Sequence, residues 1–450
     1  MTDHRGTPEE QEMLMDRTMS AGRAVTAVDR ARLRRVAFAS AVGTTIEWYD
    51  FFIFATAVSL VFNTQFFSSL SSASGTLAGF AAIGVGIAAR PLGGIVWGHF
   101  GDVAGRKTML VASLLVMGLA TVAVGLLPTY SQVGLLAPVL LVVVRFAQGI
   151  SAGGEWAGAA LMAVEHAPAE QRGRFGAYSQ IGVPAGLILA QFAFFVVRGS
   201  LSPEQFAAWG WRLPFLASVV LIGVGLVVRL KVAESPVFTA LRERRARSGR
   251  PLVDVFRERP RELLLAAASF IANNAIGYVF LAYLLSYGTG VLHLSPDLML
   301  VVVMIGSAGC LAAIVLAARW SDRIGRRPVY LAGSVLFVVW SFPFFLLIDT
   351  ANAVLMVASV LVLTTGLGLT YGPQSAWFAE LFPARFRYSG ASFAYAVGAV
   401  LGGGFAPLIA GTLRAATGTS LAISAYMTAV ALISLGAVLA MREGRGNPLD

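Results

Sequence analysis

Long apolar segments recur along the whole chain, separated by short polar stretches. A helix needs about 20 apolar residues to cross a hydrocarbon core about 30 Å thick, and most of these segments are that long. Apolar and polar residues do not alternate within them, which excludes the spans of a transmembrane β-barrel. The pattern therefore predicts an all-α integral membrane protein whose twelve transmembrane helices lie at about residues 36–62, 75–98, 108–128, 134–163, 176–198, 212–230, 261–288, 298–319, 328–348, 353–379, 388–413 and 419–441.

Two repeated motifs divide these spans into two halves of six. The turn after the second span reads GDVAGRK at 101–107, and the turn after the eighth reads SDRIGRR at 321–327. The fourth and tenth spans end in Glu165 and Glu380, each followed three residues later by proline. Two different motifs at equivalent places indicate an internal repeat with pseudo-symmetric halves. We expect a cytoplasmic tail, a six-helix half, a cytoplasmic and partly helical linker, a second six-helix half and a cytoplasmic tail, at residues 1–35, 36–230, 231–260, 261–441 and 442–450.

Composition and charge place the chain in a membrane. Charged residues make up 13% of it, against about 25% in a soluble domain, and the mean hydropathy is +0.73. The net charge of +10 comes largely from arginines before the first span and between residues 229 and 261. This placement follows the positive-inside rule rather than forming a basic patch, so no nucleic-acid partner is expected. We predict a multi-pass protein in the lipid bilayer of a bacterial inner (plasma) membrane, with both termini in the cytoplasm.

The sequence has no signature of an enzyme or of a metal site. Its four histidines lack metal-ligand spacing, and the single Cys310 forms neither an intrachain disulfide nor a cysteine metal cage. The string GDVAGRKT has the wrong glycine spacing for a phosphate-binding loop. We therefore expect a protein that is not an enzyme and that binds no metal and no nucleotide cofactor.

Two acidic side chains are predicted near the middle of the first span. Glu47 and Asp50 are three residues apart, so they share one face of the helix. A charge at mid-bilayer costs at least about 2.5–3.5 kcal/mol, which makes intramembrane acids functional candidates. Two carboxylates so close in a low dielectric do not both ionise readily and titrate as a coupled pair. The pattern favours a proton-coupling site; the alternative is that one acid only pairs with a neighbouring arginine.

Arg145 and Gln148 form a similar pair in the fourth span. A guanidinium stays charged and offers a two-pronged donor that fits a carboxylate. We expect Arg145 to bind a substrate carboxylate, and to pair with Glu47 or Asp50 when the site is empty; the alternative is a permanent interhelical ion pair. Glu155 lies about 15 Å further along the same helix. It is a candidate proton relay or gate residue, with a capped structural role as the alternative.

The second half carries neutral polar and aromatic side chains instead of a mid-membrane acid. Pseudo-symmetry relates its seventh and tenth spans to the first and fourth, so these side chains are expected to complete a ligand pocket by hydrogen bonding and stacking. Amide side chains also hold helices together, which is the alternative for each of them. Together with Tyr49 of the first span, the candidate ligand contacts are Asn273, Asn274, Tyr278, Tyr371, Gln374 and Trp377.

The duplicated loops and several longer strings resemble a known family. Twelve spans with paired D-x-x-G-R-[KR] loops are similar to the major facilitator superfamily over nearly the whole chain. The strings EWYDFF at 47–52, RPLGGIVWGHFGDVAGRK at 90–107, RFAQGISAGGEWAGAA at 145–160, WGWRLPFL at 209–216 and AESPVF at 233–238 resemble its metabolite:proton symporter branch. Members of that branch carry shikimate, 2-oxoglutarate, citrate, proline or betaine, and aromatic acids.

The resemblance implies the major facilitator fold and a monomeric symporter that imports a small organic acid with protons by alternating access. The proton gradient is then the driving force, with no cofactor. A zwitterionic osmolyte such as proline or betaine is the alternative substrate, and a channel or a non-transporting receptor is the alternative class.

The same resemblance implies that ion pairs at the duplicated loops act as gates, which hold the halves together in the outward-open state. The simpler alternative is that the loops only set topology and turn geometry. The candidate gate residues are Asp102, Arg106 and Glu165 in the first half, and Asp322, Arg326 and Glu380 in the second.

Overall fold

A computed structural model describes residues 38–94, 96–97, 106–153, 160–161, 163–165, 167–231, 251–383, 387–447 and 449. Every regular element within these residues is a helix. Ten helices are long and apolar enough to cross a membrane, and the third and fourth predicted spans contribute the shorter apolar helices Val111–Leu126 and Leu136–Ala152. The predicted all-α, twelve-span architecture is confirmed.

Most helices of the first half begin and end close to the predicted positions, whereas the fourth, expected at 134–163, is the helix Leu136–Ala152. The first span, Phe38–Gln65, contains a π-helical turn near its end. Local sequence explains several helix starts; for example, Ser202 caps α10 and is followed by proline at the first helical position. The elements are η1 (Val58–Phe62), α2 (Asn63–Gln65), α3 (Ser72–Ala88), α5 (Arg106–Leu126), α6 (Tyr130–Val133), α7 (Leu136–Ala152), η2 (Ala169–Gln171), α9 (Arg172–Ser200), α10 (Pro203–Ala208), η3 (Gly210–Arg212) and α11 (Leu213–Lys231).

The helices of the second half follow the same pattern, and one further helix lies in the linker before them. The linker helix α13 confirms the prediction that the linker is partly helical. The eleventh span is broken at Phe405, where a π-helical turn meets a helix that starts with Ala406-Pro407. The elements are α13 (Pro251–Glu258), α14 (Pro260–Tyr278), η4 (Val279–Tyr283), α15 (Leu284–Gly290), α16 (Pro296–Ile324), α17 (Arg326–Ile348), α18 (Ala353–Leu381), α19 (Arg387–Ala399), η5 (Val400–Gly404), α20 (Ala406–Thr417) and α21 (Leu421–Ala440).

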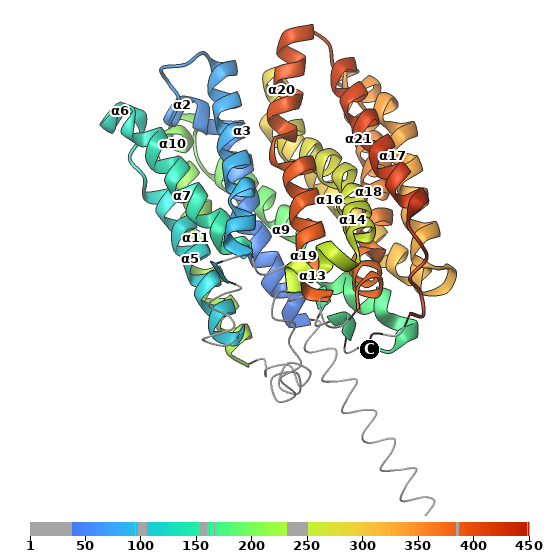
Figure 1. The fold of residues 1–450 in the computed structure, drawn as a ribbon. Helices are drawn as coiled ribbons and strands as arrows, with labels where there is room; N and C mark the ends of the chain where they lie inside the picture. Colours follow the sequence, from blue (N-terminus) through green and yellow to red (C-terminus); the bar gives the residue numbers. More distant parts are fainter. Residues whose placement is uncertain are drawn as a thin grey trace, which may run out of the picture.

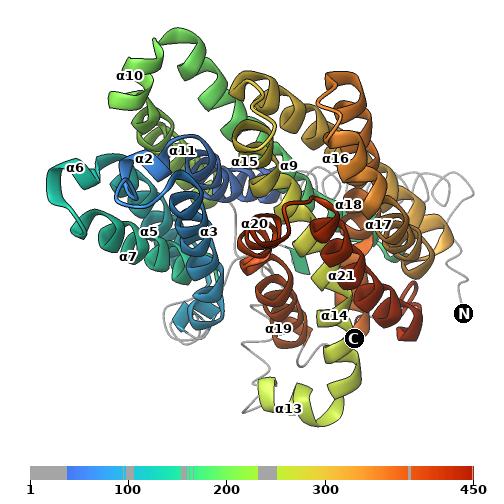
Figure 2. The same ribbon diagram turned by 90° about the horizontal axis from the view of Figure 1, so that it is seen from above.

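The two halves stand side by side (Figure 1), with the first half in blue to green and the second in yellow to red. Helix α9 of the first half packs against α16 and α18 of the second, and α3 packs against α20 and η5. The view in Figure 2 shows α3 beside α20 at the junction. We call the end of the bundle where α13 and residues 442–447 lie the lower end, as drawn in Figure 1, and the opposite end the upper end. Contacts between the halves therefore run along two separate helix groups.

Two π-helical turns meet where the first and seventh spans cross. These turns, η1 and η4, lie in the first helix of each half, and Ser59 in η1 donates a hydrogen bond to the Ala282 carbonyl in η4 at 3.1 Å. Short π-helical turns inside α-helices are frequent at functional sites. They mark spans one and seven as the helices around which a site is built.

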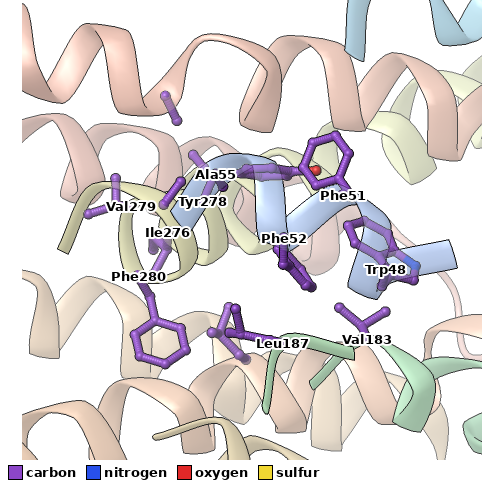
Figure 3. Packing of buried hydrophobic residues seen from close by; sticks show 14 of the residues in the cluster. Trp48, Phe51, Phe52, Ala55, Val183, Leu187, Ile276, Tyr278, Val279 and Phe280 are labelled. Atoms are coloured by element: carbon purple, nitrogen blue, oxygen red, sulfur yellow. The ribbon is translucent and has the colours of Figure 1, made fainter. Parts of the chain in front are cut away.

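An aromatic layer fills the space between the halves next to these spans. Figure 3 shows Trp48, Phe51 and Phe52 of the first span between the ring of Tyr278 and the aliphatic side chains of α9. Phe51 and Tyr278 meet edge to face, with ring centroids 5.7 Å apart. Such an arrangement stabilises the contact beyond the buried area alone. It also places the polar neighbours of Phe51 close to the centre of the protein.

Candidate functional site

The four polar residues predicted in the first and fourth spans converge on one cavity. This cavity is walled by the first four spans. Glu47 and Asp50 share its wall with Arg145 and Gln148. The structure therefore places these four side chains around the same space. The full lining is Glu47, Asp50, Phe51, Gly86, Arg90, Met117, Arg145, Gln148, Gly149 and Ala152.

Asp50 is the most deeply buried acid of this cavity, with only 1% of the residue exposed. Its Oδ1 accepts a hydrogen bond of 2.7 Å from the Ser218 hydroxyl of α11. Its Oδ2 is buried and has no hydrogen-bond partner. A buried carboxylate oxygen without a donor is unusual, because leaving such a group unsatisfied is costly. Oδ2 is therefore a position where a proton can bind.

Arg145 is equally buried and only partly satisfied. Its Nη1 donates to the Gln148 carbonyl oxygen at 3.0 Å, whereas its Nε and Nη2 have no partner. The guanidinium carbon lies 4.2 Å from the ring centroids of both Phe51 and Phe54. Aromatic faces attract a cation and leave its N–H groups available. The arrangement can receive a carboxylate, and it differs from the alternative of a guanidinium fully engaged in an interhelical ion pair.

Arg90 in the second span was not among the residues predicted from the sequence. It is 8% exposed, and its guanidinium carbon lies 5.1 Å from the ring centroids of Trp48 and Phe51. It interacts electrostatically with Glu47. The sequence does contain a signal for Arg90. An arginine inside the apolar run of the second span carries the same cost of insertion into the membrane that identified Arg145.

A second cavity lies between the halves. Its first-half wall consists of Trp48, Val183 and Pro184, and the second half provides the rest. Four of the predicted ligand contacts line this second cavity: Asn273, Asn274, Tyr278 and Tyr371.

The polar groups of the second cavity are held by neighbours on their own half. Asn273 donates to the Thr370 hydroxyl at 2.6 Å, and Asn274 donates to the Phe270 carbonyl at 3.1 Å. The Tyr371 hydroxyl lies 3.2 Å from that of Tyr395. Since Phe51 lines the first cavity and contacts Tyr278 of the second, a charged cavity adjoins a neutral, aromatic one.

Three predicted ligand contacts do not line either of these cavities. The Tyr49 hydroxyl donates to the Pro214 carbonyl at 2.8 Å and so joins the first span to α11. Gln374 accepts from the Gln180 amide at 3.5 Å across the junction of α18 and α9. The Trp377 indole donates to the Arg442 carbonyl at 3.1 Å, near the lower end. The Tyr49 and Trp377 groups are thus engaged by helix packing, whereas the Gln374 amide nitrogen is buried without a hydrogen-bond partner. None of the three lies where pseudo-symmetry placed it, in the wall of these cavities.

The predicted ion-pair cluster of the second half is present at the lower end. Arg326 binds both carboxylate oxygens of Glu380, at 3.1 and 3.2 Å, and Asp322 at 2.6 Å. The carboxylate of Asp322 also makes a contact between the two halves. Asp322 accepts from the backbone N–H groups of Gly173 and Arg174, at 2.8 and 2.9 Å, in the first turn of α9. A carboxylate is favoured at a helix N-terminus, so this contact is stabilising. Because Asp322 belongs to the second half and α9 to the first, it also joins the halves.

Glu165 makes another contact between the halves, because the Arg387 guanidinium of the second half binds it at 3.2 Å. Asp102 and Glu155 lie outside the described residues, as does the side chain of Arg106. The gate cluster of the first half and the relay role of Glu155 therefore remain predictions.

Comparison with known proteins gives matches over nearly the whole chain. The family model of the Major Facilitator Superfamily matches residues 40–407 and 315–448. The chain is 38% identical to the inner membrane metabolite transport protein YhjE of Escherichia coli K12, over 92% of this chain and 95% of that protein. It is 37% identical to the shikimate transporter of the same organism, with 92% and 96% covered. It is also 31% identical to the Escherichia coli K12 proline/betaine transporter, with 95% and 87% covered.

Solved structures show the same fold at lower sequence identity. The proton:xylose symporter XylE bound to 6-bromo-6-deoxy-D-glucose superimposes with a TM-score of 0.74 and 18% identity, over 94% of this chain and 98% of XylE. A partially occluded, inward-open form of the Escherichia coli xylose transporter gives a TM-score of 0.73 at 18% identity, over 93% and 100% of the two chains.

Proposed function

The chain belongs to the major facilitator superfamily, and from this premise we propose that it is a secondary active transporter that carries a small organic acid together with protons by alternating access. The observation that carries the proposal is the pairing, in one cavity, of a buried and partly unsatisfied guanidinium with a buried and partly unsatisfied carboxylate. The first is suited to an anionic substrate and the second to a proton. The relatives named as metabolite and shikimate transporters support this reading.

The charge balance of the first cavity gives a physical reason for coupling. Among the described residues, its ionisable side chains are Glu47, Asp50, Arg90 and Arg145, so their charges sum to zero when all are ionised. A bound carboxylate adds one negative charge, and closing low-dielectric protein around an uncompensated charge is costly. One proton on the acid pair restores neutrality. The loaded protein therefore closes readily only with substrate and proton together.

The two cavities divide the recognition of substrate. Arg145, held by Gln148, and Arg90 attract the carboxylate. Asn273, Asn274, Tyr278 and Tyr371 offer hydrogen bonds and ring faces to the remainder of the molecule. Asp50, with Glu47 beside it, takes the proton, and the proton gradient is the only driving force required.

A zwitterionic osmolyte is the second candidate substrate, supported by the relatives named as proline/betaine transporters. A zwitterion brings both charges and leaves the charge sum of the cavity at zero. The count of ionisable groups therefore gives a zwitterion no electrostatic need for a proton, and it favours a carboxylic acid as the coupled substrate.

The orientation of the protein follows from its basic residues. The lower end carries Arg172, Arg174, Arg323, Arg326 and Arg327 near the helix ends, and we place it in the cytoplasm of a bacterial inner membrane. The cluster of Arg326, Glu380 and Asp322, through the contact of Asp322 with the first turn of α9, and the ion pair of Arg387 with Glu165 then act as cytoplasmic gates. Both cavities are formed within one chain, so a monomer is sufficient for transport.

Transport assays with purified protein in lipid vesicles test the proposal. We expect an imposed inward proton gradient to drive accumulation of a carboxylate from a panel of shikimate, 2-oxoglutarate and betaine. We also expect saturable counterflow of the accepted compound, which a channel does not give. Accumulation of betaine alone would select the second candidate, and accumulation that ignores the proton gradient would contradict proton coupling. Binding without any flux would point to a receptor.

A further inference from the structure

A chain of buried hydrogen bonds runs from Arg145 to Thr121, next to Asp50. Arg145 donates to the Gln148 carbonyl oxygen at 3.0 Å, and the Gln148 amide donates to the Thr121 hydroxyl of α5 at 2.8 Å. Thr121 is fully buried, and its hydroxyl lies near the Asp50 carboxylate but donates to the Met117 carbonyl instead. Ser218 completes the surroundings of Asp50 from α11. The chain therefore leads from the residue suited to substrate to a neighbour of the residue suited to the proton.

The Thr121 hydroxyl has only one proton to donate. In this structure it donates that proton to the Met117 carbonyl at 3.0 Å, one turn earlier in the same helix. Asp50 Oδ2 meanwhile has no partner. An ionised Asp50 is a stronger acceptor than a backbone carbonyl, because hydrogen bonds to charged groups are roughly twice as strong as neutral ones. The direction of the hydroxyl thus depends on whether Asp50 carries a proton.

We propose that Thr121 is a positioning residue that transmits the protonation state of Asp50 to Arg145 through Gln148. The inference rests on the proposed function, in which Asp50 takes the proton and Arg145 binds the carboxylate. With Asp50 protonated, Thr121 donates to Met117, and Gln148 holds Arg145 as observed. With Asp50 ionised, the Thr121 hydroxyl turns to donate to the carboxylate. The oxygen lone pair that accepts from the Gln148 amide then changes direction. Gln148 then no longer holds Arg145 in the arrangement suited to substrate.

Other charged and titratable groups near Asp50 act directly rather than through this chain. The charged and titratable groups on the first, second and fourth spans line the same cavity or contact Asp50 itself. The helices α5 and α11 face Asp50 with hydroxyl groups instead. The charged and titratable groups are Glu47 and Tyr49 on the first span, Arg90 on the second, and Arg145 on the fourth.

The chain contains a matched control for Thr121. Thr56 of the first span is also buried, donates to the carbonyl one turn earlier, that of Phe52, at 2.9 Å, and accepts from the Gln191 amide at 3.0 Å. This pair has the same chemistry as Thr121 and Gln148. It is not hydrogen-bonded to Asp50 or Arg145, so its loss leaves the link between them intact.

The test compares Thr121→Val, Thr121→Ser and Thr56→Val by measuring shikimate binding and uptake over a range of pH. Loss of the buried hydrogen bond between Gln148 and Thr121 predicts that Thr121→Val weakens binding at low pH about twofold to tenfold. It also flattens the pH dependence of binding. Thr121→Ser keeps the hydroxyl and is expected to restore the pH profile. Thr56→Val is expected to keep the profile of the parent protein. Thr121→Ala, with a smaller side chain, repeats the test if the valine variant fails to fold.

Failure of the inference differs from failure of the proposed function. If the parent protein accumulates shikimate under a proton gradient but Thr121→Val keeps the parental pH profile, the transmission role is overturned and the symporter remains. If the parent protein shows no gradient-dependent uptake of any compound in the panel, the proposed function falls and this inference with it.

A separate set of contacts involves residues 442–447, which we call the tail. Glu443 accepts from the backbone N–H groups of Arg326 and Arg327 at 2.8 and 2.9 Å, and so caps the first turn of α17. The Asn447 amide donates to the Glu380 carbonyl at 3.3 Å, and Arg172 of the first half donates to the Asn447 carbonyl at 2.7 Å. The tail therefore lies over the Arg326–Glu380 pair and reaches both halves.

We infer that the tail is a strap that stabilises the closed lower end. Opening of that end separates α9 from α17 and α18, which breaks the contact between Arg172 and Asn447. The capping contact of Glu443 keeps the tail in place across the junction. Loss of this cap is expected to favour the open lower end without altering either cavity.

A cysteine placed between the halves reports this opening. Ser375 of α18 is 1% exposed and packs against Gly176 of α9. In a background in which the single native cysteine is removed by Cys310→Ser, Ser375→Cys becomes the only thiol. We expect Glu443→Ala to raise its rate of alkylation by N-ethylmaleimide severalfold. Glu262→Ala, which removes an acid in the first turn of α14 that pairs with Arg259 just before the helix, is the control and should leave the rate unchanged. An unchanged rate both in Glu443→Ala and in a chain that ends at Met441 would overturn the strap.

Discussion

Replacing Arg145 with alanine is expected to reduce substrate binding by about 30-fold to several thousandfold, the equivalent of about 2–5 kcal/mol. Two effects combine in this loss. The substrate carboxylate loses its donor in a buried site, and the first cavity loses one of the two positive charges that balance Glu47 and Asp50. Titration of the purified protein with the transported acid, by calorimetry or by thermal shift, measures the effect.

A lysine at the same position separates charge from geometry. Arg145→Lys keeps the positive charge but loses the planar fork and its contacts with the two phenylalanine rings. We expect intermediate binding, weaker than in the parent protein. Arg198→Ala is a matched control, because Arg198 pairs with the exposed Asp297 away from both cavities, and such surface pairs contribute little. Unchanged affinity in Arg145→Ala, at normal expression, would contradict its role as the carboxylate anchor.

The sequence predicts the helices of this protein well because membrane spans depend on a simple property. Each backbone polar group in hydrocarbon must be satisfied within its helix, so segment length and apolarity determine the spans. The seventh span was expected at 261–288 and runs Pro260–Gly290, and the ninth was expected at 328–348 and runs Arg326–Ile348. The differences are confined to helix ends, where caps and polar residues extend a helix beyond its apolar part.

The core of the candidate site was predictable for the same reason. A charged side chain within a span has to face the protein interior, so charges on different helices tend to meet. The charges of Glu47, Asp50 and Arg145 are expected to meet for this reason, and the same rule, used on every span, also identifies Arg90. It does not identify Thr121 or Ser218. Hydroxyl groups are common in apolar helices, and only the packing of α5 and α11 shows which of them lie beside Asp50.

Pseudo-symmetry was a weaker guide to the second half. It correctly selects the seventh and tenth spans as walls of a cavity, and it does not give the rotation or depth of individual side chains. Asn273 and Tyr371 face the cavity, whereas Trp377 contacts the chain beyond the last span. That contact depends on where residues 442–447 fold back, which no periodic pattern in the spans specifies.

The largest expected effect on transport comes from Asp50→Asn, which mimics a permanently protonated acid. Accumulation driven by a proton gradient is expected to disappear, because the amide can release no proton. Exchange of substrate across vesicles should persist. With the amide in place, Glu47 and a bound carboxylate together balance Arg90 and Arg145, so the loaded protein remains neutral and can alternate. The empty protein carries one excess positive charge and should return slowly. Uptake of labelled substrate with and without a gradient, and with unlabelled substrate inside, separates these steps.

Glu47→Gln distinguishes the two acids of the pair. Asp50 is the more buried of the two and has an oxygen without a partner, so we expect the loss of accumulation in Asp50→Asn and only a partial effect in Glu47→Gln. The reverse result exchanges their roles, and partial coupling in each single variant means that the pair shares the proton. Ser218→Ala removes the one hydroxyl that donates to Asp50 at 2.7 Å without changing the charge of the site. It should alter the pH at which uptake is half-maximal while keeping accumulation. A double variant that still accumulates substrate with an unchanged dependence on the proton gradient would exclude both acids and leave Glu155 as the next candidate.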